Sequence, residues 1–129
     1  MKKIAVIGTG LSALSLAYHL PALDITFFEK SWRPGGRIST RKHNQYAFDH
    51  GAHYLKLDHG IIGLSEYLSK IDAIKILKGQ FCSNISQKSP IEDKEIIVGK
   101  EGNESIPINI HKSLHYPTYF SKQITSIET

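Results

Sequence analysis

The sequence predicts an α/β domain that opens with a parallel β-α-β unit. Residues 4–7 are continuously apolar and bounded by glycine, as in a strand buried on both faces of a parallel sheet. Apolar residues then recur at three- and four-residue intervals from Leu11 until Pro21 interrupts the pattern, which predicts a helix. Residues 24–29 have the pattern of a second strand, so one β-α-β unit covers residues 3–29.

The composition indicates one globular domain that suits an anionic ligand. Its 129 residues suffice for a single core. Hydrophobic residues make up 40% of the chain and charged residues 22%, a composition that excludes disorder and fibrous repeats. The 16 basic residues exceed the 12 acidic ones but are dispersed, and no RNA or zinc motif accompanies them, so we predict no nucleic-acid partner. Cys82, the only cysteine, excludes an internal disulfide and favours a cytoplasmic location. No apolar stretch is long enough to cross a membrane.

The first candidate site lies between the first strand and the helix, where six residues fit the GxGxxA dinucleotide fingerprint: Gly8, Thr9, Gly10, Leu11, Ser12 and Ala13. Gly8 permits a tight turn, Gly10 lets the backbone approach a pyrophosphate at the helix N-terminus, and Ala13 keeps the helix close to the strand. Glu29 ends the second strand, where a carboxylate would bind a ribose hydroxyl. The alternative is a glycine turn without a ligand and a solvated acid, but the combination predicts nucleotide binding.

A second glycine motif follows this acid. Residues 30–45 are rich in Gly, Pro, Arg and Ser and lack periodicity, which predicts a long functional loop. Gly35 and Gly36 would expose backbone N–H groups, and Arg37 would donate hydrogen bonds to phosphate oxygens. Lys30, at the start of the loop, is counted with these predicted binding residues.

The middle of the chain predicts shorter elements. Residues 48–54 contain a short strand or turn. The next pattern, an amphipathic helix, is marked by Ile61, Leu64, Leu68 and Ile71. Residues 73–77 are a candidate strand.

The last third of the chain predicts a return to the first sheet. Residues 83–95 are polar and weakly patterned, residues 96–98 are a short apolar run, and residues 101–104 form a turn. Pro107 suits the first turn of a final helix, whose apolar side carries Ile106, Ile110 and Leu114. Residues 119–127 look extended.

Three features occur together: the GxGxxA fingerprint, the acid Glu29 at the end of the second predicted strand, and RxGGRxxT over residues 33–40. This combination resembles the flavin-containing amine oxidase superfamily, in which both glycine motifs hold the FAD pyrophosphate. Residues 49–54 read DxGAxY and are similar to the element of the renalase-like branch that runs beside the flavin. Gly51 and Ala52 would make backbone contacts there, whereas His53 replaces the Gln common in that branch. His50 and His53 fit exposed loop positions as well as catalytic ones, so no catalytic residue and no metal ligand is assigned.

This resemblance implies an incomplete Rossmann-like FAD-binding domain with part of a small substrate-domain insertion. Residues 1–56 would be the FAD/NAD(P)-binding Rossmann-like core, residues 57–102 a partial substrate-side insertion, and residues 103–129 a helix and strand returning to the nucleotide-binding sheet. The implied cofactor is FAD. In full-length relatives the implied substrate is a small molecule, a reduced nicotinamide or an amine, which the flavin oxidises before it passes electrons to oxygen.

Three functional hypotheses follow. The leading one is the N-terminal FAD-binding part of a renalase-like oxidoreductase, inactive by itself because relatives close the flavin site with a later Gly-Asp segment. The second is a dinucleotide-binding module without catalysis, which stands alone or joins a partner chain that completes the fold through an exposed sheet edge. The third is a non-functional product that keeps enough of the first β-α-β core to be stable.

Overall fold

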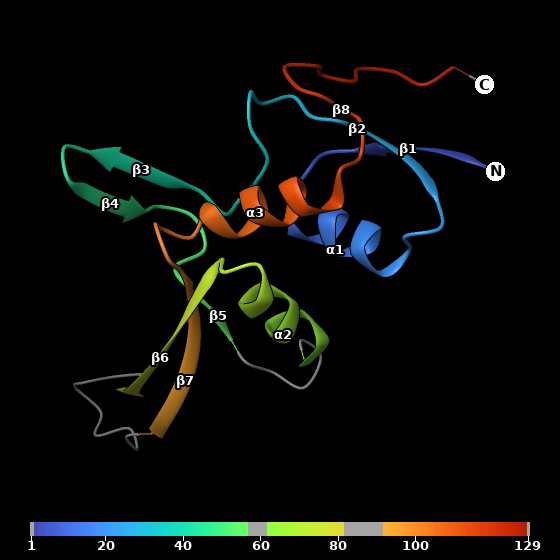
Figure 1. Cartoon of the computed structure of the whole chain (residues 1–129). Helices are drawn as coiled ribbons and strands as arrows, with labels where there is room; N and C mark the ends of the chain where they lie inside the picture. Colours follow the sequence, from blue (N-terminus) through green and yellow to red (C-terminus); the bar gives the residue numbers. More distant parts are fainter. Residues whose placement is uncertain (1, 57–61, 82–91, 129) are drawn as a thin grey trace.

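The computed structural model describes residues 2–56, 62–81 and 92–128, with a small parallel sheet at one end of the molecule. Three parallel strands lie in the order β1 (Lys3–Ile7), β2 (Asp24–Phe28) and β8 (Thr118–Tyr119). Helices α1 (Leu11–His19) and α3 (Ser105–Leu114) pack against each other along one face of this sheet (Figure 1). We call these five elements the parallel region. The predicted β-α-β unit is confirmed, and each of its boundaries lies within one residue of the expected position.

Strand β1 differs from its prediction because only one of its faces is covered. Ile4 and Val6 are half-buried against the core, whereas Ala5 is exposed and Ile7 is 56% exposed. The helices lie on the side of Ile4 and Val6, and β1 is an edge of the sheet among the described strands. The expectation of a strand buried on both faces is therefore wrong, since no second layer among the described residues covers the side of Ile7.

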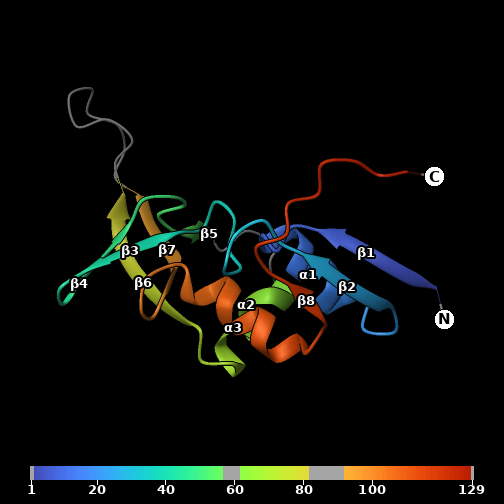
Figure 2. The ribbon, with the colours of Figure 1, turned by 90° about the horizontal axis from the view of Figure 1, so that it is seen from above.

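An antiparallel sheet occupies the other end of the molecule. Its strands lie in the order β5 (Leu55–Lys56), β7 (Glu92–Gly99) and β6 (Ile74–Phe81), and helix α2 (Ile62–Lys70) leads into β6. We call these four elements the antiparallel region. A hairpin of β3 (Thr40–His43) and β4 (Tyr46–Asp49) projects from the same end of the molecule, while both chain termini lie at the opposite end (Figure 2).

Several predictions for these later elements are confirmed and others are wrong. Helices α2 and α3 form where apolar spacing predicted them, and β6 contains residues 74–77 of the strand predicted over 73–77. The predicted loop over residues 30–45 is wrong for Thr40–His43, because these residues pair with β4 through a turn at Asn44, whose φ is 52°.

Charged strands and the C-terminal segment account for the other errors. Residues 92–95 were expected to be unpatterned but form half of β7, because their charged side chains lie on a solvated sheet surface. The predicted extended segment 119–127 belongs to a strand only at its start, in β8, and Ser121 and Lys122 then bond to the residues that follow β2. Three predictions lie outside the described residues, namely those for Ile61, for Cys82 and for residues 83–91.

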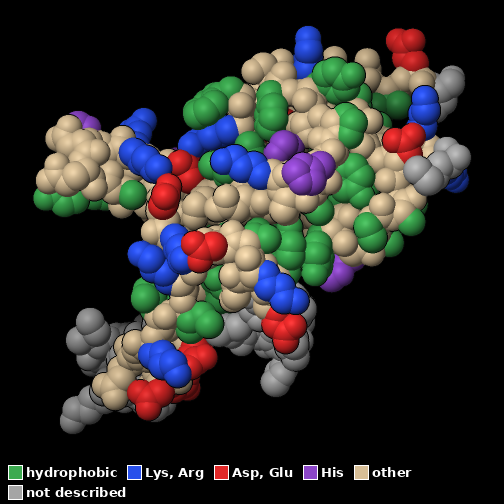
Figure 3. All heavy atoms as spheres, viewed as in Figure 1, with side chains coloured by type: hydrophobic (Ala, Val, Ile, Leu, Met, Phe, Trp, Pro, Cys, Tyr) green, Lys and Arg blue, Asp and Glu red, His purple; other side chains and the backbone are tan. Residues whose placement is uncertain are grey.

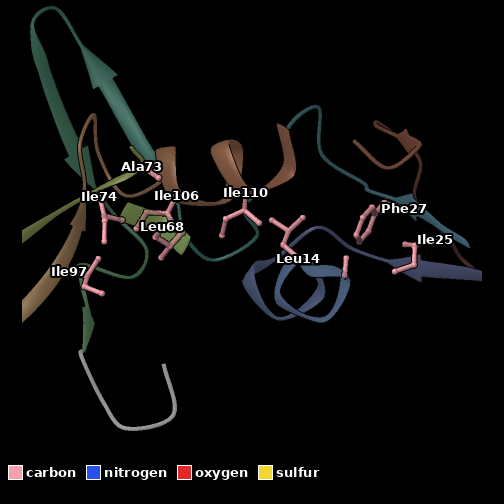
Figure 4. Packing of buried hydrophobic residues seen from close by; sticks show 10 residues of the cluster. Leu14, Ile25, Phe27, Leu68, Ala73, Ile74, Ile97, Ile106 and Ile110 are labelled. Carbon is pink, nitrogen blue, oxygen red and sulfur yellow. The ribbon is translucent and has the colours of Figure 1, made fainter. Parts of the chain in front are cut away.

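One hydrophobic cluster joins the two regions. Ile25 and Phe27 of β2 pack beside Leu14 of α1, while Leu68 and Ile97 lie at the antiparallel end (Figure 4). Helix α3 runs between these groups and contributes the buried residues Ile106, Pro107 and Ile110. Each fully buried side chain of this size stabilises the fold by about 1.5–3 kcal/mol. Helix α3 therefore links the two ends of the core.

Candidate dinucleotide-binding site

A cavity of about 770 Å³ lies where β1 and β2 end and α1 begins. Its lining includes ten of the twelve predicted binding residues, namely Gly8, Gly10, Leu11, Ser12, Ala13, Glu29, Lys30, Gly35, Gly36 and Arg37. The other two, Gly51 and Ala52, line a second cavity together with Gly36, Arg37, Ser39 and His50. The fold thus brings three motifs together that are separated in the sequence.

The N-terminus of α1 opens into this cavity without a side chain in front of it. Gly10 is the N-cap, with extended backbone at φ −71° and ψ 169°, and no acidic residue lies in the first turn. A Cβ atom built on Gly8 or on Gly10 would meet nothing within 4 Å. The first N–H groups of a helix have no intrahelical acceptor, and they carry the positive end of the helix dipole. The geometry and the charge of this helix end therefore suit a phosphate group.

The second glycine motif lies directly against the first. The Gly35 N–H donates to the Thr9 carbonyl oxygen at 3.1 Å, and Gly10 and Gly35 form a parallel bridge. Gly36 has a φ of 58°, and a Cβ atom built there would lie 3.4 Å from the Gly10 Cα atom. Because neither glycine carries a side chain, both loops present backbone to the same space.

Glu29 is held at the floor of the cavity by three hydrogen bonds. Its Oε2 atom accepts from the Thr9 backbone N–H at 2.8 Å and from the Thr9 hydroxyl at 2.7 Å, and Oε1 accepts from the Ser31 N–H at 2.8 Å. Burial acts to raise the pKa of Glu29, but the hydrogen bonds from Ser31 and Thr9 outweigh it and hold the pKa below its ordinary value. The Glu29 carboxylate is therefore a charged acceptor at neutral pH, and it lines the cavity.

Three cationic side chains also line the cavity, those of Lys30, Arg37 and Lys122. Arg37 and the two lysines are solvent-exposed, and none of the ion pairs found in the described part of the chain involves them. Their positive charge adds to that of the α1 N-terminus. The cavity therefore attracts an anionic ligand from solution.

Sequence reasoning missed the segment that closes one side of the cavity. Lys122, Gln123 and Ile124 line it, although they lie far from the motifs in the sequence. The Lys122 N–H donates to the Glu29 carbonyl oxygen at 2.8 Å, and the Ser121 N–H donates to the Ser31 carbonyl oxygen at 2.9 Å. This segment continues from β8, so only the pairing of β8 with β2 brings it to the site.

The loop that carries Gly51 and Ala52 packs against the loop that carries Arg37. The Ala52 N–H donates to the Arg37 carbonyl oxygen at 3.0 Å. A Cβ atom on Gly51 would lie 2.0 Å from that same oxygen, so only glycine fits at this position. His50 lies 3.1 Å from the Ser39 hydroxyl through its Nε2 atom, while His53 is exposed. No cluster of three or more potential metal ligands occurs in the described ranges.

Sequence comparison also indicates a Rossmann-like domain in the first half of the chain. Residues 6–65 match the family described as the NAD(P)-binding Rossmann-like domain. The fold is Rossmann-like.

None of the helices in the described ranges is long and apolar enough to cross a bilayer.

The curated relatives of this Rossmann-like domain are much longer proteins. Coproporphyrinogen III oxidase of Staphylococcus aureus is 43% identical over 54 residues, which are 39% of this chain and 12% of that protein. Protoporphyrinogen oxidase 2 of Arabidopsis thaliana, chloroplastic/mitochondrial, is 40% identical over 53 residues, which are 40% of this chain and 10% of that protein. The shared segment is thus about a tenth of each relative.

A solved structure resembles almost the whole chain. Wild-type putrescine oxidase bound to putrescine has a TM-score of 0.63 and covers 93% of this chain. The chain corresponds to 51% of that protein, at 11% sequence identity. At this identity the likeness shows the fold, which extends beyond the β-α-β unit.

Proposed function

We propose that this Rossmann-like domain binds FAD through the ADP half of the cofactor and is the FAD-binding part of an oxidoreductase. The observation that carries the proposal is the contact between the two glycine loops around one cavity, which the open N-terminus of α1 also faces. A plain glycine turn does not require the second loop.

The residues present fit the ADP half of FAD. The open space at Gly8 and Gly10 allows a pyrophosphate to approach the first N–H groups of α1, and Arg37 supplies a charged donor. The Glu29 carboxylate, which follows β2 and lines the cavity, suits a ribose hydroxyl. Because the pKa of Glu29 is lowered, its carboxylate is charged at neutral pH and disfavours a 2′-phosphate. FAD or NAD therefore fits better than NADP, and the second glycine pair favours FAD.

FAD supplies a ring that accepts a hydride from a reduced substrate. The role of residues 2–56 in that reaction is to bind and orient the adenosine end. We propose a renalase-like function for the whole protein, with a reduced nicotinamide or an amine as substrate, because residues 49–54 carry the DxGAxY element beside the glycine loops. The named relatives are oxidases of coproporphyrinogen III and protoporphyrinogen, so porphyrinogens are the substrates to compare.

The decisive experiment measures flavin retention. Purified protein is mixed with FAD, freed of unbound ligand and examined by visible absorption, with ADP as competitor. We expect a retained flavin spectrum that ADP displaces. The Gly10→Ala variant should fold, because its Cβ atom meets only open space, but should lose FAD and ADP because the methyl group occupies the phosphate approach. Ser15→Ala, in the same helix and outside the cavity lining, is the matched control. Equal retention by both variants would contradict the proposal.

A second candidate function is a module that binds a dinucleotide and assembles with a partner chain. It is favoured by β1, which is an edge of the described sheet and whose Ile7 is 56% exposed. An exposed edge is a template for another strand. Light scattering across a range of protein concentrations tests this function, and a monomer at every concentration would argue against self-assembly.

A further inference from the structure

Two residues at the start of α3 connect the loops on which the proposed site depends. Glu104 is only 7% exposed, and its carboxylate accepts hydrogen bonds from the Arg33 guanidinium and, at 3.3 Å, from the Thr40 N–H. In return the Glu104 N–H donates to the Thr40 hydroxyl at 3.0 Å. Arg33 and Thr40 are the two ends of the RxGGRxxT loop, so Glu104 holds both of them.

Asn103 holds the second loop in a similar way. It is 2% exposed, its Nδ2 group donates to the Ala52 carbonyl oxygen at 2.8 Å, and its backbone N–H donates to Asp49 Oδ1 at 2.8 Å. The Thr40 hydroxyl also donates to Asp49 Oδ1, at 2.5 Å, which joins the two loops. Asn103 Oδ1 accepts from the Gly99 N–H at 2.8 Å, so the network continues into β7.

Stability alone does not explain why the polar side chains of Asn103 and Glu104 are buried. A buried ion pair loses much of its attraction to desolvation, and apolar side chains of similar volume often stabilise a fold as well or better. Here every buried side-chain polar atom in the described residues has a partner, so the network is closed and rigid. Neither Asn103 nor Glu104 lines the 770 Å³ cavity. They hydrogen-bond loop 33–40, which contributes to that cavity, and loop 49–52, which contributes to the second cavity, but they do not line the first cavity themselves.

We propose that Asn103 and Glu104 are positioning residues that hold loops 33–40 and 49–52 in the arrangement that binds the cofactor pyrophosphate. The link to the cofactor rests on the proposed function, whereas the holding of the loops does not. The start of α3 therefore determines the affinity of a site that the β-α-β unit forms.

The test combines hydrogen exchange with ligand affinity in the Glu104→Gln variant. We expect about tenfold faster exchange of the Ala52 N–H, which is bonded to Arg37, and about tenfold weaker binding of ADP and FAD. Exchange of the Leu14 N–H, which is bonded to Gly10 in α1, should stay unchanged. Glu101→Gln removes the same charge from the same turn, at a side chain that is 79% exposed, and is the matched control.

Two further variants keep the test decisive. Arg33→Gln removes the cationic partner of Glu104, at a side chain that is 28% exposed, and should weaken ADP binding as Glu104→Gln does. The double variant Arg33→Gln with Glu104→Gln replaces the ion pair by a neutral pair and should restore most of the ADP affinity, which general destabilisation would not do.

The outcomes separate the two proposals. If Glu104→Gln behaves like Glu101→Gln, or if Leu14 exchanges faster to the same extent as Ala52, the positioning role is overturned. If exchange changes as expected but the unmodified protein binds neither ADP nor FAD, the proposed function fails while the holding of the loops stands.

Discussion

The two ends of the molecule use similar charged residues in different ways. In the antiparallel region, lysines pair with acids on the sheet surface, as in Lys78 with Glu95 at 2.7 Å and Lys94 with Glu92 at 2.5 Å. Figure 3 shows basic and acidic side chains intermixed over β6 and β7. Next to the parallel region, Arg37 instead lines a cavity and belongs to none of the ion pairs found among the described residues. The two groups thus differ in surroundings: Arg37 lies in the cavity that contains the N-terminus of α1, whereas the charges of the antiparallel sheet pair with each other.

Two glycines of the candidate site also have different surroundings. A Cβ atom on Gly10 would enter open space, whereas one on Gly51 would lie 2.0 Å from a backbone oxygen. Gly51 is therefore needed for the packing of its loop, whereas Gly10 is not required by packing. We therefore expect that stability and ligand binding can be changed separately in this chain.

The largest expected effect lies in the antiparallel region. Ile97 is fully buried, so Ile97→Ala should lower the free energy of unfolding by about 3 kcal/mol through lost burial and the cavity that remains. Denaturant unfolding measures the loss. The ADP affinity of the folded fraction should not change, because Ile97 lies outside the cavity lining. Weakened ADP binding by folded protein would show that the two regions are not separable.

Arg37→Ala should produce the converse result. Arg37 is exposed, so its loss should leave the unfolding free energy unchanged while it weakens ADP and FAD binding by about 2 kcal/mol, the scale of a charge-assisted hydrogen bond. Isothermal titration measures both ligands. Arg41→Ala on the β3 strand removes the same charge outside the cavity lining and serves as the control. Equal affinities in the two variants would remove Arg37 from the site.

Thr9→Val tests the carboxylate at the cavity floor. The change removes the hydroxyl bond to Glu29 but keeps the backbone bond, so the unfolding free energy should fall by about 1 kcal/mol at neutral pH. Thr26→Val on β2 makes the same chemical change outside these bonds and is the control. A loss of equal size in both variants would mean that the Thr9 hydroxyl bond is not its cause.

The pH dependence of Thr9→Val provides a second measurement. Because the folded pKa of Glu29 lies below its ordinary value of 4.5, its stabilising contribution is complete above pH 4.5 and is lost as the pH falls through the folded value. Without the Thr9 hydroxyl the pKa should rise towards 4.5. The stability difference between variant and unmodified protein should therefore shrink in acid, and a constant difference would contradict this explanation.

The smallest effect is expected on the surface of the antiparallel sheet. Glu95→Gln removes the partner of Lys78, whose pKa the hydrogen bond and charge of Glu95 raise. The Lys78 side chain is 80% exposed, so solvent screens the pair and the melting temperature should not change measurably. Glu95→Ala is measured beside it to separate charge from side-chain packing. A clear fall in melting temperature for Glu95→Gln would show that this surface contributes more than its exposure indicates.

Local patterns were sufficient for the elements that depend on neighbours in the sequence. The apolar spacing of α1, the stop at Pro21 and the glycine motifs depend on residues close together, and the structure forms these elements within one residue of expectation. The ten predicted residues that share one cavity were found for the same reason. The start of β7 and strand β3 were missed because charged strands with a solvated face lack an apolar pattern. The pairing of β3 with β4, whose residues 46–48 are exposed, follows no buried pattern either.

The sequence by itself determined the Rossmann-like start of the chain, its glycine loops and the acid that follows β2, because turn geometry and helix periodicity are local properties. Only the tertiary structure decided that Lys122 reaches the cavity and that Glu104 and Asn103 hold its loops. These contacts join residues that are distant in the chain, 64 positions apart in the case of Thr40 and Glu104. They exist only because β8 pairs with β2 and α3 packs on α1. A local sequence pattern does not predict such long-range pairings.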